Sequence, residues 1–242
     1  MKIKLFLFLI LLSVLSFTQE EMGWDAKFAI GIGYTPGWFI PDYNIINEQV
    51  KALGVDEFSS AGFFATGYSG YVSLAVVKNI RIGGMHLNGS TSNKGYKNGF
   101  NKEAVYSASL SGLTIEYSFP FIKQVAVSVG TIIGAGNTTL ELYQNKGEFD
   151  WNGIWNELDG TKDNTNNINR KLSNTFFTIS PTLNVDIPFY RFFAFRIGGG
   201  YMFELGKNWE VDNGVKLNDI PSGLSGNALF LQVGIYVGYF NY

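Results

Sequence analysis

The chain has no cysteine among its 242 residues. Disulfide bonds therefore cannot stabilise it, and a lipoprotein anchor, which needs a cysteine behind an export signal, is excluded. Charge is also scarce: charged residues make up 16% of the chain, where about 25% is usual for a soluble domain. The formal net charge of −2 gives no general attraction to nucleic acid. We therefore expect no nucleic-acid partner.

Long hydrophobic runs are missing except at the start of the chain. Two lysines precede the apolar run 5–12, and small or hydroxyl residues follow at Ser16 and Thr18. This order of charged, apolar and small residues is typical of a cleaved secretory signal peptide. The run is too short to cross a bilayer as a helix, which needs about 20 residues. We predict that residues 1–18 are the export signal, cleaved near Thr18.

The remaining residues, 19–242, are predicted to form one domain. They include no stretch that resembles a transmembrane helix, although the whole chain is rich in aromatic residues (16%) and glycine (29 residues). Apolar residues alternate with small or polar ones: Trp24, Phe28 and Ile32 share one face of an expected strand, and Gly31 lies on the other. Only helices and closed barrels satisfy their backbone polar groups in lipid, so this pattern predicts a barrel.

The same alternation recurs along the whole chain and predicts an all-β fold. We expect an eight-stranded antiparallel transmembrane β-barrel, closed as an up-and-down meander. The expected strands cover residues 24–34, 63–77, 80–87, 104–119, 124 to beyond 133, 174–187, 192–205 and 228–240.

The connections between these strands fall into two alternating kinds. Three are short, at 78–79, 120–123 and 188–191. Four are long, at 35–62, 88–103, 144–173 and 206–227. Short periplasmic turns and long outer loops are typical of bacterial outer-membrane barrels, so we expect an outer-membrane protein with both termini in the periplasm and outer-membrane lipid around it. A soluble lipocalin also has eight strands, but its outward faces would be polar.

Some strands depart from simple alternation. Ser107, Ser109 and Ser111 fall on the face that the rest of their strand assigns to lipid, which predicts a bulge near Gly112. A second change of phase is expected at 134–137. Pro181 interrupts its strand and removes one ladder hydrogen bond. Two similar turns, 119–123 and 187–191, each place aromatic residues beside a proline, as expected at a membrane interface.

Charged residues on the non-lipid faces are predicted to point into the lumen, because charges facing lipid are costly. Nearly balanced signs favour a structural ion-pair network, and a catalytic carboxylate pair is the alternative. Small inward residues such as Gly33 and Gly200 leave room for Tyr71, Phe230 and Tyr236, which predicts a filled lumen rather than a pore. The expected network comprises Asp25, Lys27, Arg81, Glu116, Asp186, Arg196 and Glu204.

Three further features concern a single histidine, one loop and one amphipathic segment. His86 is the single histidine, and it lacks the serine two positions later that some lipid-modifying barrels carry; an interface-exposed histidine is the alternative. The loop 148–171 carries oxygen ligands for calcium without any EF-hand spacing, and a solvated loop is the alternative. Residues 42–53 form an amphipathic pattern, for a helix that caps the barrel mouth or lies on the membrane. The possible calcium ligands are Asp150, Asn152, Glu157 and Asp159. We assign no cofactor and no metal.

The last strand carries Gln232, Gly234, Val237 and Tyr239 in the order polar, glycine, hydrophobic, aromatic. This resembles the C-terminal assembly signal of bacterial outer-membrane proteins, although three residues follow Tyr239. The whole chain after the signal resembles the small eight-stranded OmpA/OmpX-like barrels by architecture. The resemblance implies insertion by the barrel-assembly machinery. Because the chain stops at Tyr242, we expect no periplasmic domain.

The leading functional hypothesis is a non-enzymatic outer-membrane barrel with a structural or surface-interaction role carried by four long outer loops. The second is a narrow channel or a conduit for hydrophobic ligands. The third is a lipid-modifying enzyme. A fold alone does not decide among them, because function depends on sites placed on the fold.

Overall fold

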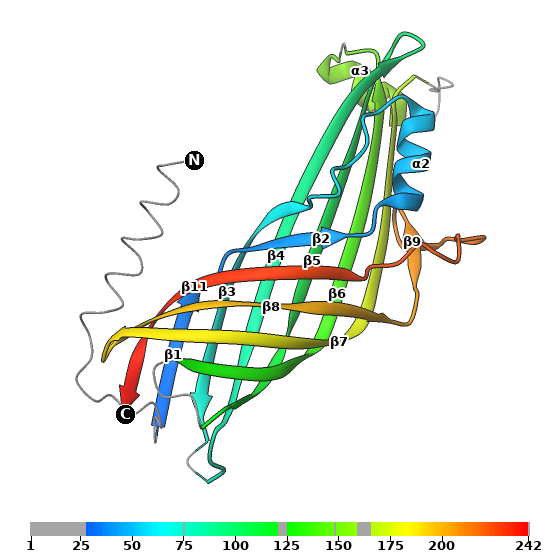
Figure 1. The fold of residues 1–242 in the computed structure, drawn as a ribbon. Helices are drawn as coiled ribbons and strands as arrows, with labels where there is room; N and C mark the ends of the chain where they lie inside the picture. Colours follow the sequence, from blue (N-terminus) through cyan, green and yellow to red (C-terminus); the bar gives the residue numbers. More distant parts are fainter. Residues whose placement is uncertain (1–27, 75, 121–124, 148, 159–165, 242) are drawn as a thin grey trace, which may run out of the picture.

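The computed structural model describes residues 28–74, 76–120, 125–147, 149–158 and 166–241, and Figure 1 shows their arrangement. The expected export signal at 1–18 and most of the expected turn at 120–123 lie outside these residues. Within the described residues no helix is long and apolar enough to cross a membrane.

The chain forms an antiparallel sheet that closes into a ring of eight strands, as predicted. One position in the ring is shared by β1 and β2, because both pair with β11 on one side and with β3 on the other. The strands of the ring are β1 (Phe28–Tyr34), β2 (Gly37–Pro41), β3 (Phe63–Ser73), β4 (Ile80–Lys97), β5 (Phe100–Ser118), β6 (Ala126–Asn145), β7 (Ile168–Tyr190), β8 (Phe193–Leu205) and β11 (Ala228–Asn241).

Smaller elements lie between these strands. The helix α2 (Asn44–Leu53) follows β2, and the helix α3 (Trp151–Leu158) lies between β6 and β7. The short strands β9 (Trp209–Val211) and β10 (Val215–Lys216) form a hairpin that extends the sheet from β7. The expected helix at 42–53 is therefore present, with Ile46 and Val50 buried.

The prediction of a long loop at 88–103 is wrong. Strands β4 and β5 instead continue until they meet at the turn Asn98–Gly99. Both turn residues have positive φ angles, 55° and 81°, which is the Asn-Gly pattern of a two-residue hairpin. The polar composition of this segment suggested a loop, but the polar residues lie on the outward face of two paired strands.

The four strands β4–β7 are much longer than the others. They have 18, 19, 20 and 23 residues, whereas β8 has 13 and β11 has 14. A transmembrane strand needs about 9–11 residues. The four strands therefore continue past the ends of β8 and β11 as a tall sheet, seen in the upper part of Figure 1.

The outward face of this sheet changes character along its height. Its lower part carries exposed apolar residues such as Ile82, Leu113 and Leu183, which continue around β8, β11 and β1 as an apolar belt. Directly above the belt, two rows of outward positions on β4–β7, together with Thr66 of β3, carry hydroxyl or amide groups; one of these residues, Thr139, is only 8% exposed. We call them the hydroxyl–amide face: Thr66, Asn88, Ser90, Ser107, Ser109, Asn137, Thr139, Ser173 and Thr175.

The expected bulge near Gly112 and the expected shift at 134–137 are both wrong. Pairing of β5 with β4 and β6, and of β6 with β7, runs through these positions without a change of register. Ser107, Ser109 and Ser111 do point outward, in phase with Leu113. They are polar because their part of the sheet stands beyond the belt, and the strand has no irregularity there.

Pro181 lies on the outward face of β7 and pairs with Thr131 of β6. On the opposite side, the pairing of β7 with β8 is interrupted between Ile179 and Thr182. The residue without an N–H thus coincides with a gap in the ladder, as proline requires.

The upper interior of the barrel is an apolar core capped by α2. The ring of Tyr43 stacks on Phe58 with centroids 5.2 Å apart, and meets Tyr106 of β5 edge-on at 4.9 Å. The end of α2 is held by Lys97 of β4, whose Nζ donates to the carbonyl oxygen of Ala52 at 2.7 Å. The helix therefore closes the mouth of the barrel, which was one of its two expected positions.

Small residues make room for rings inside the barrel, as predicted. A Cβ placed on Gly33 would lie 2.9 Å from Cγ of Tyr236 and 2.8 Å from the carbonyl oxygen of Ile235. A Cβ on Gly200 would lie 2.7 Å from the ring of Phe230. These glycines are needed for packing.

We expect Gly33→Ala to lower the free energy of unfolding by about 1–3 kcal/mol, because the added methyl group overpacks the interior. Gly84→Ala is a matched control on the outward face of β4, since its Cβ would meet nothing closer than 3.7 Å. Urea unfolding of both variants in lipid vesicles measures the difference. Equal unfolding midpoints for the two variants would contradict this account of the packing.

Candidate functional site

The strongest cluster of chemical groups lies in the lower lumen. It contains two arginines and two carboxylates from four strands: Arg81 of β4, Glu116 of β5, Asp186 of β7 and Arg196 of β8. All four residues are at least 93% buried. Alternation of the strands places each of them inward, because their neighbours in sequence face lipid.

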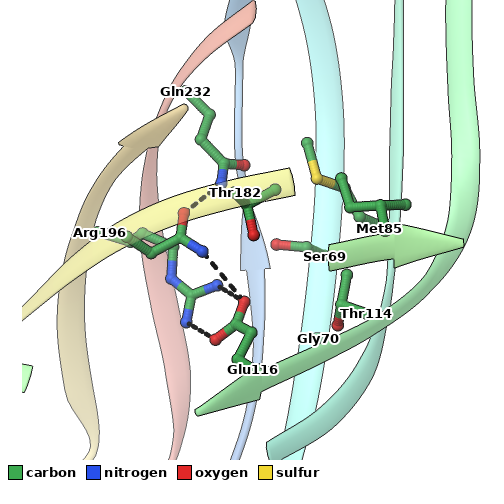
Figure 2. A pocket seen from close by; sticks show the side chains of 10 residues that line it. Ser69, Gly70, Met85, Thr114, Glu116, Thr182, Arg196 and Gln232 are labelled. Carbon is green, nitrogen blue, oxygen red and sulfur yellow. Dashed lines mark hydrogen bonds and ion pairs between the residues drawn. The ribbon is translucent and has the colours of Figure 1, made fainter. Parts of the chain in front are cut away.

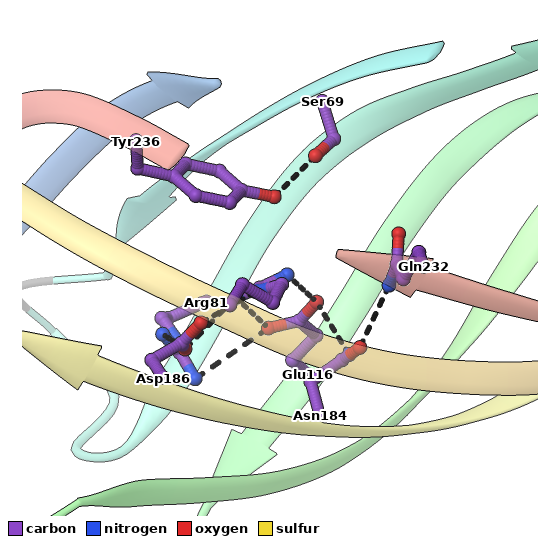
Figure 3. A network of polar contacts seen from close by, with 8 residues as sticks. Ser69, Arg81, Glu116, Asn184, Asp186, Gln232 and Tyr236 are labelled. Carbon is purple, nitrogen blue, oxygen red and sulfur yellow. Dashed lines mark hydrogen bonds and ion pairs between the residues drawn. The ribbon is translucent and has the colours of Figure 1, made fainter. Parts of the chain in front are cut away.

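Arg196 holds both carboxylates at once. Its Nη1 and Nη2 donate to the two oxygens of Glu116 at 2.8 and 3.1 Å. Its Nε and Nη2 donate to the two oxygens of Asp186 at 2.5 and 3.0 Å. Figure 2 shows the contacts of Arg196 with Glu116, and Figure 3 shows the polar network around Glu116 and Asp186. Paired, planar contacts of this kind are the strongest that an arginine makes with a carboxylate.

Arg81 completes the cluster from the opposite side. Its Nη1 donates to Asp186 at 2.6 Å, and its Nη2 lies 3.5 Å from Glu116. Both guanidinium groups lie over the ring of Tyr71, at 4.7 and 5.0 Å from its centroid. Two positive and two negative charges therefore balance within one buried layer.

Uncharged polar groups surround this layer. Asn184 donates to Glu116 at 3.2 Å and accepts a hydrogen bond from Gln232 at 2.8 Å. The hydroxyl groups of Ser69 and Tyr236 are hydrogen-bonded to each other. A cavity of about 10 Å³ lies among Ser69, Thr114 and their neighbours, as Figure 2 shows, and has room for about one water molecule.

The geometry of this cluster favours structure over catalysis. A general acid or base needs a group free to exchange a proton with a substrate. Both carboxylates here are held by arginines, and the cavity beside them has no room for a substrate. The arrangement joins four strands across the lumen.

The structure brings together four of the seven residues that we expected in the lumen network. Glu204 lies elsewhere, where it accepts hydrogen bonds from Asn174 at 2.5 Å and from the backbone N–H of Gly226 at 2.7 Å. Asp25 and Lys27 lie outside the described residues. Glu204 was predicted to belong to the network because strand alternation shows whether a side chain points into the lumen. Alternation does not show at which height along the barrel axis the side chain lies.

Three uncharged members of the lower lumen were not predicted from the sequence: Tyr71 as a partner of the arginines, Asn184 and Ser69. Asn184 was detectable, because it lies two residues before Asp186 and therefore on the same face. The contacts of Tyr71 and Ser69 cross the barrel, and no local pattern predicts them.

The four residues of the expected assembly signal point in different directions. Gln232 is buried in the lumen, and a Cβ on Gly234 would meet Thr35. Val237 is 52% exposed on the apolar belt. The hydroxyl group of Tyr239 accepts a hydrogen bond from Arg191 at 2.7 Å. Their role in assembly stays a prediction.

His86 lies on the outward face, at the upper edge of the apolar belt. Its Nδ1 is hydrogen-bonded to Oγ of Ser111 at 2.6 Å, and its ring lies beside that of Tyr68 with centroids 5.3 Å apart. A serine partner thus exists on the adjacent strand rather than two positions later. Within the described residues no carboxylate contacts His86, so the third member of a catalytic triad is missing there.

The possible calcium ligands do not converge. Asp150 accepts a hydrogen bond from the N–H of Gly153 at the start of α3, and Glu157 accepts one from Asn167. Asp159 lies outside the described residues. In the described part of the chain no group of three or more His, Asp or Glu side chains is placed to hold a metal ion.

We expect Arg196→Met to lower the free energy of unfolding by about 3–5 kcal/mol, because it leaves two buried carboxylates with one arginine. Arg170→Met is the control: its pair with Asp212 is exposed, and its loss should cost at most about 1 kcal/mol. The double variant Arg196→Met/Glu116→Gln restores the charge balance and should recover part of the loss. Urea unfolding midpoints measure all three. Equal effects of Arg196→Met and Arg170→Met would show that the cluster is not stabilising.

No protein-family model and no curated protein matches the chain. Solved structures do match. A major outer membrane protein from Thermus thermophilus is 12% identical, with a TM-score of 0.51 over 88% of this chain and 99% of that one. Neisserial surface protein A is 12% identical (TM-score 0.36, 87% and 96% covered), and the attachment invasion locus protein Ail of Yersinia pestis, solved with the heparin analogue sucrose octasulfate, is 9% identical (TM-score 0.42, 88% and 97% covered). The likeness to the Thermus protein shows that this chain has the fold of the small outer-membrane β-barrels.

Proposed function

We propose that the protein is a non-enzymatic, integral outer-membrane barrel that interacts with other molecules at the cell surface. The observation that carries the proposal is the tall sheet of β4–β7, which continues above the apolar belt with a polar outer face. A barrel that only anchored itself would not need strands of about twice the spanning length.

The position of the chain ends supports one orientation of the barrel in the membrane. Phe28 at the start of β1 pairs with Asn241 at the end of β11, and both lie at the end of the barrel opposite the tall sheet (Figure 1). Outer-membrane barrels keep short turns in the periplasm and long segments outside. Both termini are therefore assigned to the periplasm, where the barrel-assembly machinery inserts such proteins, and the tall sheet to the exterior.

The tip of the tall sheet offers groups suited to recognition. Trp151 and Trp155 of α3 are 73% and 57% exposed, and Tyr96 at the end of β4 is 70% exposed. Tryptophan and tyrosine are enriched where proteins bind partners, because they bury a large area at low conformational cost. Just below the tip, Tyr143 donates a hydrogen bond to Glu141, which raises the pKa of the Tyr143 phenol above its ordinary value.

Transport has less support. In the described residues the lower lumen is filled by the arginine–carboxylate cluster and the upper lumen by the apolar core under α2. Eight strands leave an interior that side chains fill. The interaction role therefore falls to surfaces outside the lumen.

Epitope insertion tests the orientation. A short tag inserted between Asn98 and Gly99, at the top of the tall sheet, should bind antibody on intact cells. The same tag between Lys78 and Asn79, in the turn that joins β3 to β4, should bind antibody only after the outer membrane is permeabilised. The reverse pattern would overturn the proposal.

Conductance in planar bilayers tests the second hypothesis. The refolded wild-type barrel should show no large, steady current, because both halves of its lumen are filled. A current like that of a general porin would make transport the leading function instead.

A further inference from the structure

We propose that the hydroxyl–amide face binds the sugar headgroups of glycolipid in the outer leaflet. The inference rests on the proposed orientation, with the tall sheet outside the cell. It concerns a surface that neither the filled lumen nor the aromatic tip explains.

The position of the face is the first argument. On β4–β7 the outward residues change from apolar to polar at one row of the sheet, which contains His86, Ser111, Ala135 and Phe177. Tyr68 of β3 pairs with His86 at the edge of this row, whereas β3 becomes apolar again beyond Thr66, at the exposed Phe64. Aromatic rings of this kind mark the level where hydrocarbon ends and headgroups begin. The first row of the hydroxyl–amide face lies two residues further along each strand, about 7 Å away. The face is therefore continuous with the lipid-contacting belt.

The chemistry of the face is the second argument. Two successive rows across β4–β7 carry only hydroxyl and amide side chains, and the charged pairs begin above them, with Lys171 and Glu141. Uncharged donors and acceptors match the hydroxyl groups of a sugar. An anionic phosphate would instead favour arginine or lysine at this level.

Much of this face makes no hydrogen bond within the protein itself. Asn137 donates to Thr175 and accepts from Thr139, so part of the face is internally paired. Within the described residues, the side chains of Asn88, Ser107 and Ser109 make no hydrogen bond with the protein. These three residues lie close together on β4 and β5. Asn88 is paired with Ser109, and Ser107 lies two residues before Ser109 on the same face of β5.

Weak individual contacts are sufficient for such a site. A net hydrogen bond changes a binding constant by only about threefold to tenfold. A glycolipid whose acyl chains already lie against the belt is held next to the face, however, so its headgroup has a high effective concentration there. The flat sheet then needs no pocket.

The triple variant Asn88→Ala/Ser107→Ala/Ser109→Ala tests the proposal. The full-length barrel is refolded in phosphatidylcholine bilayers that contain increasing amounts of a rough lipopolysaccharide with its core sugars. Its unfolding temperature should rise with the lipopolysaccharide content, and the triple variant should need at least about ten times more lipopolysaccharide for the same rise. The control variant Asn218→Ala/Ser222→Ala/Ser225→Ala, in the β10–β11 loop, should behave as wild type.

A parallel series with lipid A, which keeps the phosphates and acyl chains but lacks the core sugars, identifies the group that is bound. Lipid A should raise the unfolding temperature of the wild type less than lipopolysaccharide does. An equal rise with lipid A, or an unchanged triple variant, would overturn the proposal. Equal unfolding temperatures of all variants in pure phosphatidylcholine show that folding is intact. Antibody binding to the tag at Asn98 tests the orientation independently. Failure of the proposed orientation can therefore be distinguished from failure of the proposed glycolipid binding.

Discussion

Closure of the sheet is the constraint on which the rest of the structure depends. In a bilayer no water is present to pair with the N–H and C=O groups of an open edge, so every strand needs two neighbours. The ring closes through β11, which pairs with β8 on one side and with β1 and β2 on the other. With eight strands the enclosed space is narrow, and each inward side chain must fit those from the opposite wall.

The barrel contains two kinds of interior, stacked one above the other. At the level of the belt the outside is apolar and the inside is polar, as shown by Ile82 and Arg81 on neighbouring positions of β4. Above the belt the outward residues become polar, and the inside becomes an apolar core with Leu87, Leu110 and Phe176. The same strands thus behave first as parts of a membrane protein and then as parts of a soluble one.

This inversion explains how much of the structure was predictable from sequence. Alternation gave the eight strands and the inward direction of Arg81 and Arg196, because both depend on nearest neighbours along one strand. Alternation also led us to expect a bulge near Ser107. The backbone pairing there is regular, and only the polarity of the outward residues changes. Which charges meet across the lumen depends on register and tilt, so the separation of Glu204 from the cluster was not predictable.

Because the strands differ in length, opposite sides of the barrel differ in height. The wall formed by β4–β7 continues beyond the apolar belt on one side, while β8 and β11 end near the level of the belt on the other. A cylinder of uniform height would present the same profile to every lateral neighbour. This barrel instead presents a polar wall in one direction and a low rim in the other, so rotation about its own axis changes what an adjacent molecule meets.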